Sequence, residues 1–143
     1  ALFGQRVAFD MLFEEGIEHV WKRHTALARA TRAAVAVWAK GGALDFNIVD
    51  PARRSDSVTT ILTPGFDPQS LRDFCRERCG VILGSGIGDL GGKAFRIAHM
   101  GYANAPMVLG TLGAVEIGLK SLGIPHGAGG VQAAVVSLQD FFG

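Results

Sequence analysis

Apolar positions along the first segment predict a helix that lacks a polar face. Residues 2–15 are apolar around most of the circumference of a helix, at Leu2, Phe3, Val7, Ala8, Phe9, Met11, Leu12 and Phe13. A short helix of this kind must be covered on more than one side. A small domain covers only one side, so the segment predicts a further contact with another domain, another subunit or both.

The next segment has the clearest helical pattern in the chain. Its inward positions recur at i, i+3, i+4 and i+7, which is the spacing of one helix face. They are Ile17, Val20, Trp21, His24, Leu27, Ala28, Thr31, Val35 and Trp38. Lys40-Gly41-Gly42 then ends the helix, with a cation in the last turn and glycine beyond it.

Four segments have the patterns of strands. Leu44 to Ile48 alternates apolar and polar residues, as a half-buried strand does, and Ser57 to Thr63 is rich in β-branched residues. Pro51 and the polar run after it make the turn between them. Val81 to Leu83 and Ala94 to Met100 predict two further strands.

Three more helices complete the pattern. One begins at Asp67-Pro68, an N-cap followed by proline, and stops at Gly80; another begins at Asn104. Residues 131–142 predict the last, amphipathic helix. This order of elements favours an α+β fold, a small, mostly antiparallel sheet with helices packed on one face.

The length of 143 residues suits one domain with a single core. Within residues 1–143 we expect a helical N-terminal region, residues 2–40, that acts as an inter-domain or dimer element. Residues 41–143 would then form the sheet-and-helix body. The chain starts with Ala1 and not with methionine, which suggests a piece of a longer protein.

Charge and hydropathy disfavour two classes of partner. Fourteen Lys and Arg residues nearly balance thirteen Asp and Glu residues, which gives no electrostatic case for nucleic acid or an anionic membrane. No apolar run approaches the roughly 20 residues that span a bilayer. The two cysteines, Cys75 and Cys79, share one helix face, which favours core packing over a disulfide or metal role and fits a cytoplasmic protein.

A glycine-rich loop, residues 84–92, contains the literal pattern G-x-G-x-x-G at Gly86, Gly88 and Gly91. This pattern marks a dinucleotide site only where a helix follows and offers its N-terminus to the pyrophosphate. Here Lys93 and a strand-like run follow, which favours a tight connection between strands.

Arg96 is the candidate binding residue. Along its strand Phe95 and Ile97 point to one face, whereas Arg96 points to the other, between the small residues Ala94 and Ala98. The planar guanidinium suits a bidentate grip on a carboxylate. The alternative is a surface arginine that is paired with a local acid.

Two histidines favour structural roles. His99 shares the parity of Phe95 and Ile97, so it points inward or lies at the strand end and needs hydrogen-bond partners. His24 lies on the inward stripe of the long helix and favours a packing role over that of a base.

The run Phe95-Arg96-Ile97-Ala98-His99-Met100-Gly101 resembles the C-terminal region of class V aminotransferases, as does Gly91-Gly92-Lys93 before it. Within that family the serine–glyoxylate and alanine–glyoxylate aminotransferases look most similar. Residues 14–24, Ser57 to Thr60, Ala114 to Leu119 and the tail from Pro125 to Ala134 agree in order and spacing. The resemblance covers nearly the whole chain.

The resemblance implies the C-terminal small domain of a type I fold, in a homodimer whose large domain binds pyridoxal 5′-phosphate through a lysine Schiff base. It also implies that Arg96 holds the α-carboxylate of the amino acid or 2-oxo acid substrate. The cofactor would carry the amino group from serine or alanine to glyoxylate. Lys22, Lys40, Lys93 and Lys120 match none of the family's cofactor motifs. We therefore expect the cofactor site and the catalytic residues in the large domain, and this chain alone to be inactive.

Two other functions stay open. One is a stand-alone, non-catalytic α+β module for ligand binding or regulation, and the other is ureidoglycine–glyoxylate transfer. Cysteine desulfurase chemistry is disfavoured because neither Cys75 nor Cys79 lies in an exposed loop suited to persulfide transfer.

Overall fold

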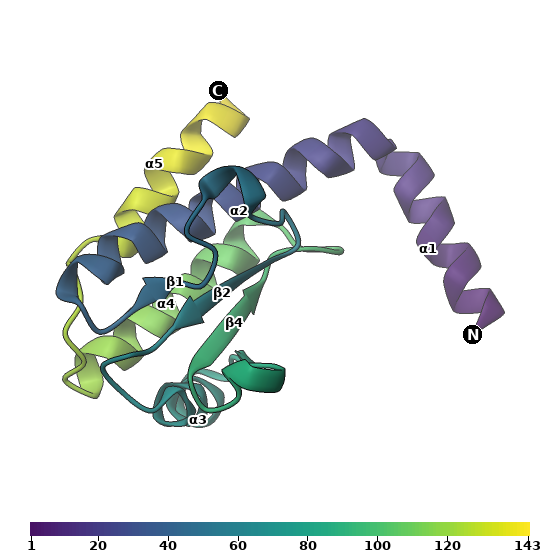
Figure 1. The fold of residues 1–143 in the computed structure, drawn as a ribbon. Helices are drawn as coiled ribbons and strands as arrows, with labels where there is room; N and C mark the ends of the chain where they lie inside the picture. The colour runs from purple at the N-terminus through teal and green to yellow at the C-terminus, as the bar shows by residue number, and fades with distance from the viewer.

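A computed structural model describes residues 1–143 and contains five α-helices and one four-stranded sheet (Figure 1). The helices are α1 (Leu2–Glu15), α2 (Ile17–Trp38), α3 (Pro68–Cys79), α4 (Ala105–Ser121) and α5 (Gly130–Phe142). The strands are β1 (Asp45–Phe46), β2 (Val58–Leu62), β3 (Gly84–Ser85) and β4 (Ala94–Ala98). Short 3₁₀ turns occupy η1 (Ala39–Gly41), η2 (Pro51–Arg53) and η3 (Gly88–Leu90). The predicted α+β class is confirmed.

The sheet has the order β1-β2-β4-β3, and every neighbouring pair is antiparallel. In the central pair, Thr60 stands opposite Arg96 and Ile61 stands opposite Phe95. Ile61, Phe95 and Ile97 are buried, whereas Thr60 and Arg96 are partly exposed. One face of the sheet is therefore packed against the core, and we call the other its open face.

The helices gather on the packed face. Figure 1 shows α2, α4 and α5 on the same side of the sheet, with α3 at the end nearest β4. The largest fully buried side chains come from both layers and include Trp38, Leu27, Leu112 and Phe95. This core holds the sheet from one side and leaves the open face free for other contacts.

Helices α3 and α4 begin at the N-cap residues that the sequence predicted, and α3 ends at the predicted glycine. The Asp67 carboxylate accepts a hydrogen bond from the Gln69 backbone N–H at 2.9 Å, and Asn104 caps α4 through the N–H of Met107 at 2.9 Å. Gly80 ends α3 in the left-handed conformation at φ 68°. Glycine adopts this conformation without a steric cost, so the predicted stop is confirmed.

The predicted strand over residues 44–48 is shortened to Asp45–Phe46. Arg54 accounts for the difference, because its Nε donates to the carbonyl of Ile48 at 2.8 Å and its Nη2 to that of Val49 at 3.1 Å. These carbonyls are thereby paired with a side chain and not with a neighbouring strand. The guanidinium also lies 3.7 Å from the centre of the Phe46 ring.

The predicted strand at residues 81–83 is wrong, since the paired residues are Gly84–Ser85. Val81 N–H donates back to the carbonyl of Cys75 at 2.9 Å, as part of the end of α3. The carbonyl of Leu83 accepts from Arg72 Nε at 3.1 Å. Backbone groups that could have paired with β4 are therefore already bonded to α3.

The helical N-terminal region consists of two helices that differ in packing. The chain turns at Gly16, where φ is 84°, and α1 leaves the body (Figure 1). No residue of α1 is buried, and Phe3 and Phe13 are 88% and 77% exposed. Helix α2, in contrast, is built into the body, where it packs on α5 and the sheet.

Trp38, at the end of α2, joins three helices. Its indole Nε1 donates to the Glu116 carboxylate of α4 at 2.9 Å, and the same oxygen accepts from the Val131 N–H of α5 at 3.1 Å. Burial acts to raise the pKa of Glu116, but these two hydrogen bonds, together with the nearby Lys120 and His126, outweigh it and hold that pKa below its ordinary value. The start of α5 lies so close that a Cβ on Gly130 would fall 2.1 Å from Trp38 Nε1.

Replacing Gly130 with alanine should therefore weaken this junction. We expect Gly130→Ala to lower the free energy of unfolding by about 3 kcal/mol, because overpacking adds to the loss of a hydrogen bond to a charged group. Gly110→Ala in α4 is the control, since a Cβ there meets no atom within 4 Å. Urea unfolding should show Gly110→Ala at or slightly above the parent stability; equal losses in the two variants would contradict the prediction.

Candidate functional site

Arg96 lies in the middle of β4, between β2 and β3, with its side chain on the open face. Its Nε donates to the carbonyl of Ser85 in the neighbouring strand at 2.7 Å. Nη1 and Nη2 form no hydrogen bond with the chain, and none of the five ion pairs includes Arg96. The structure therefore does not show the local acid partner that the alternative interpretation required.

The residues around Arg96 leave room on the open face. Ala98 is exposed and Thr60 is half-buried, but Ala94 is covered, with 1% of its surface exposed. Gly84 stands opposite Arg96 on the β3 side and presents no side chain. The guanidinium occupies the space over Gly84, so room for a ligand lies toward the exposed Ala98 and not toward the covered Ala94.

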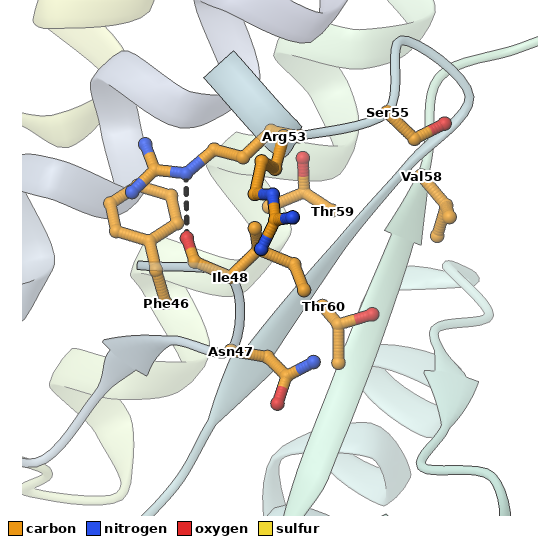
Figure 2. Close-up of a pocket in the computed structure, with 9 residues that line it drawn as sticks. Phe46, Asn47, Ile48, Arg53, Ser55, Val58, Thr59 and Thr60 are labelled. Atoms are coloured by element: carbon orange, nitrogen blue, oxygen red, sulfur yellow. Dashed lines mark hydrogen bonds between the residues drawn. The ribbon is translucent and has the colours of Figure 1, made fainter. Parts of the chain in front are cut away.

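A shallow hollow of about 250 Å³ lies on the β1 side of the open face (Figure 2). Figure 2 shows the side chains of Asn47 and Thr60 beside one another there, with the Arg53 side chain extending from η2 and ending near Ile48. Arg53 is exposed, and its side chain forms no hydrogen bond or ion pair with the chain. The sequence reasoning missed this hollow, because only the strand register brings Asn47 next to Thr60.

His99 is fully buried and uses both ring nitrogens. Its Nδ1 lies 3.0 Å from the carbonyl oxygen of Asp56, and its Nε2 lies 2.9 Å from Thr59 Oγ1. A carbonyl oxygen only accepts, so Nδ1 carries the proton and Nε2 accepts from the hydroxyl. Burial lowers the pKa of His99 to about 4, which keeps the ring neutral. The predicted hydrogen-bonded structural histidine is confirmed.

Two residues of α2 hold the segment that follows β4. Arg23 donates through Nη1 to the carbonyls of Gly101 at 2.9 Å and Ala103 at 2.7 Å. Its Nε and Nη2 bind Glu15 at 2.6 and 2.8 Å. His24 Nε2 accepts from the Gly101 N–H at 3.1 Å. The sequence reasoning predicted packing for His24 and assigned nothing to Arg23, because neither contact has a local sequence signal.

The cysteines and the glycine-rich loop have structural surroundings. Cys75 is fully buried, and this burial raises the pKa of its thiol to about 11, which disfavours a reactive thiolate. No group of three or more potential metal ligands exists in residues 1–143. The glycine-rich loop continues into η3 and β4, so it lacks the helix that a dinucleotide fingerprint requires.

The sequence of the chain is similar to those of serine–glyoxylate aminotransferases. A serine–glyoxylate aminotransferase of Methylorubrum extorquens is 39% identical over 141 residues, which are 97% of this chain and 34% of that protein. The chain belongs to the class V aminotransferases. It is similar to the serine–glyoxylate aminotransferases among them, and it corresponds to a C-terminal portion. No protein-family model matches the chain.

Solved aminotransferase structures have the same fold. A pyridoxamine–pyruvate aminotransferase of Mesorhizobium loti superimposes with a TM-score of 0.85 at 33% identity, over 94% of this chain and 34% of that one. A ureidoglycine–glyoxylate aminotransferase of Bacillus subtilis gives a TM-score of 0.75 at 32% identity, over 91% and 33%. The chain thus spans about one third of the length of these relatives.

The lysines of the chain bear on whether it could hold a covalent cofactor. Lys22, Lys40, Lys93 and Lys120 are all exposed, and none lies in an enclosed cavity that could shield a Schiff base. The residues present therefore do not fit a covalent pyridoxal phosphate site. No helix combines the length and the hydropathy that crossing a bilayer requires.

The buried His99 predicts a pH dependence of stability. Its pKa of about 4 lies below the ordinary value of 6.5, so the unfolded chain binds the proton more readily than the folded one. Stability is complete above pH 6.5, and about 2–3 kcal/mol should be lost by pH 4.5. Urea unfolding at both pH values should show a smaller loss for His99→Asn than for the parent. His19→Gln, on an exposed residue, is the control, and an unchanged loss in His99→Asn would refute this assignment.

Proposed function

We propose that this chain is the C-terminal small domain of a pyridoxal-phosphate-dependent aminotransferase that uses glyoxylate as amino acceptor and serine or alanine as donor. Its part is to bind and orient the substrate through Arg96. The observation that carries the proposal is the guanidinium of Arg96, which projects from an open sheet face with both terminal nitrogens free. The similarity to glyoxylate-using aminotransferases supports the same function.

The chemistry of the guanidinium suits this role. Its two terminal N–H₂ groups match the spacing of the two oxygens of a carboxylate, and charge-assisted pairs of this kind are strong and directional. A substrate held in this way has its Cα fixed relative to the sheet, which is the orientation that a transamination site requires. Pyridoxal phosphate, when bound by the rest of the enzyme, supplies the electron sink for the amino group.

The exposed surface of α1 supports the expected division into an N-terminal contact region, residues 2–40, and a body, residues 41–143. Most of the large apolar side chains of α1 are exposed, with Leu2 81% and Val7 57% exposed. We propose that the N-terminal region, residues 2–40, carries the contact with the large domain or the second subunit of a homodimer, through α1 and the start of α2. Residues 41–143, together with the rest of α2, form the body that presents Arg96.

The related structures give a second candidate for the amino donor. Related structures include a ureidoglycine–glyoxylate and a pyridoxamine–pyruvate aminotransferase at nearly the same identity to this chain. Ureidoglycine is therefore the second candidate donor. A stand-alone ligand-binding module is the remaining alternative, and the coding sequence upstream of Ala1 separates it from the enzyme.

Removing the guanidinium should impair every substrate that carries an α-carboxylate. In the full-length protein, Arg96→Ala should lower kcat/KM for each such donor more than tenfold, corresponding to at least ~2 kcal/mol for a charge-assisted bidentate pair. Absorbance of the bound cofactor should stay nearly unchanged. Arg78→Ala, an exposed arginine of α3, is the control. Equal loss of cofactor and activity would show that Arg96 is structural.

A donor screen tests the choice of substrate. The full-length protein is supplied with glyoxylate and, in turn, serine, alanine, ureidoglycine and pyridoxamine, and formation of glycine is measured. We expect serine or alanine to give the highest kcat/KM. A higher value with ureidoglycine would replace the first candidate with the second, and no glycine from any amine would contradict the enzyme assignment.

A further inference from the structure

The glycine-rich loop between β3 and β4 forms a tight hairpin beside Arg96. Gly86 N–H donates to the carbonyl of Ala94 at 3.0 Å, which closes the hairpin beyond the last strand pair. A Cβ on Gly86 would lie 1.9 Å from the carbonyl oxygen of Leu90, so no larger residue fits there. The loop therefore brings the short strand β3 back alongside β4, directly next to the arginine.

Gly84, in β3, lies beneath the side chain of Arg96. A Cβ at this position would lie 3.2 Å from Arg96 Cβ, 3.4 Å from Nε and 3.5 Å from Nη2. The guanidinium thus lies across the backbone of β3, over the one neighbour on that side that has no side chain. The next residue, Ser85, supplies the carbonyl that accepts from Nε at 2.7 Å.

We infer that this hairpin positions the substrate-binding arginine, with Gly84 providing the space and the carbonyl of Ser85 the anchor. The inference rests on the proposed function of Arg96. Because Nε is already bonded to the backbone, the side edge of the guanidinium that includes Nε is engaged. Only the end formed by Nη1 and Nη2 remains for a bidentate contact. The carboxylate therefore binds end-on, and Gly84 is a positioning residue that acts through Arg96.

Anchoring of this kind has a physical purpose. A free arginine side chain loses considerable rotamer freedom when it binds a ligand, which weakens the binding. A backbone hydrogen bond at Nε fixes the plane of the guanidinium before the substrate arrives. A side chain at position 84 would displace the guanidinium from this plane, although it would touch no substrate atom.

A double-mutant cycle in the full-length enzyme tests the inference. Gly84→Val should lower kcat/KM for the amino acid donor at least tenfold, and Gly84→Ala should lower it a few-fold, because a single Cβ requires shifts of only tenths of an ångström. Combined with Arg96→Ala, the Gly84→Val change should have less than a twofold further effect, because the side chain through which it acts is gone. Gly113→Ala, where a Cβ meets no atom within 4 Å, is the matched control.

The possible outcomes separate the inference from the function on which it rests. If Gly84→Val still costs tenfold in the Arg96→Ala background, Gly84 acts on the fold and the positioning role is wrong. If Arg96→Ala itself leaves substrate use unchanged, the proposed function fails together with the inference. Bound-cofactor absorbance and the thermal midpoint identify variants that fail to fold, and for these Gly84→Ala replaces Gly84→Val in the cycle.

Discussion

The antiparallel pairing of β2 with β4 is the constraint on which the rest of the structure depends. Its register places Ile61 opposite Phe95 on the packed face and Thr60 opposite Arg96 on the open face. A shift of one residue would exchange the two faces, which would bury a guanidinium and expose the core. The hydrophobic effect on one face thereby determines where the charged group on the other face points.

Much of the fold could be predicted because its signals are local. Helix caps at Asp67 and Asn104, the stop at Gly80 and the alternation around Arg96 all depend on residues close in sequence. The strand errors have the opposite origin. Arg54 and Arg72 use side chains to bind carbonyls that the pattern alone assigned to the sheet, and such competition depends on the distance in space between the groups.

The site was predictable only in part for the same reason. Strand parity indicates that Arg96 leaves the sheet on the side opposite Phe95, but it does not indicate which neighbours surround the guanidinium. The bond to Ser85 and the proximity of Gly84 follow from the pairing of β3 with β4, and the hollow at Asn47 follows from the pairing of β1 with β2. The hydrogen bond that Arg23 donates to the carbonyl of Gly101 joins residues far apart in the chain.

Because α1 extends from the body at Gly16, a small change in its angle moves its far end by a large distance. The base of the helix also lies next to Arg23, which binds the carbonyls of Gly101 and Ala103. A helix of 14 residues is about 21 Å long, so a rotation of about 10° at its base moves the far end by about 4 Å. The base of α1 is tied by Glu15 to Arg23, and the same guanidinium holds the backbone just after β4. A change in the angle of α1 would therefore be transmitted, through the Arg23 side chain, to the backbone just after the strand that carries Arg96.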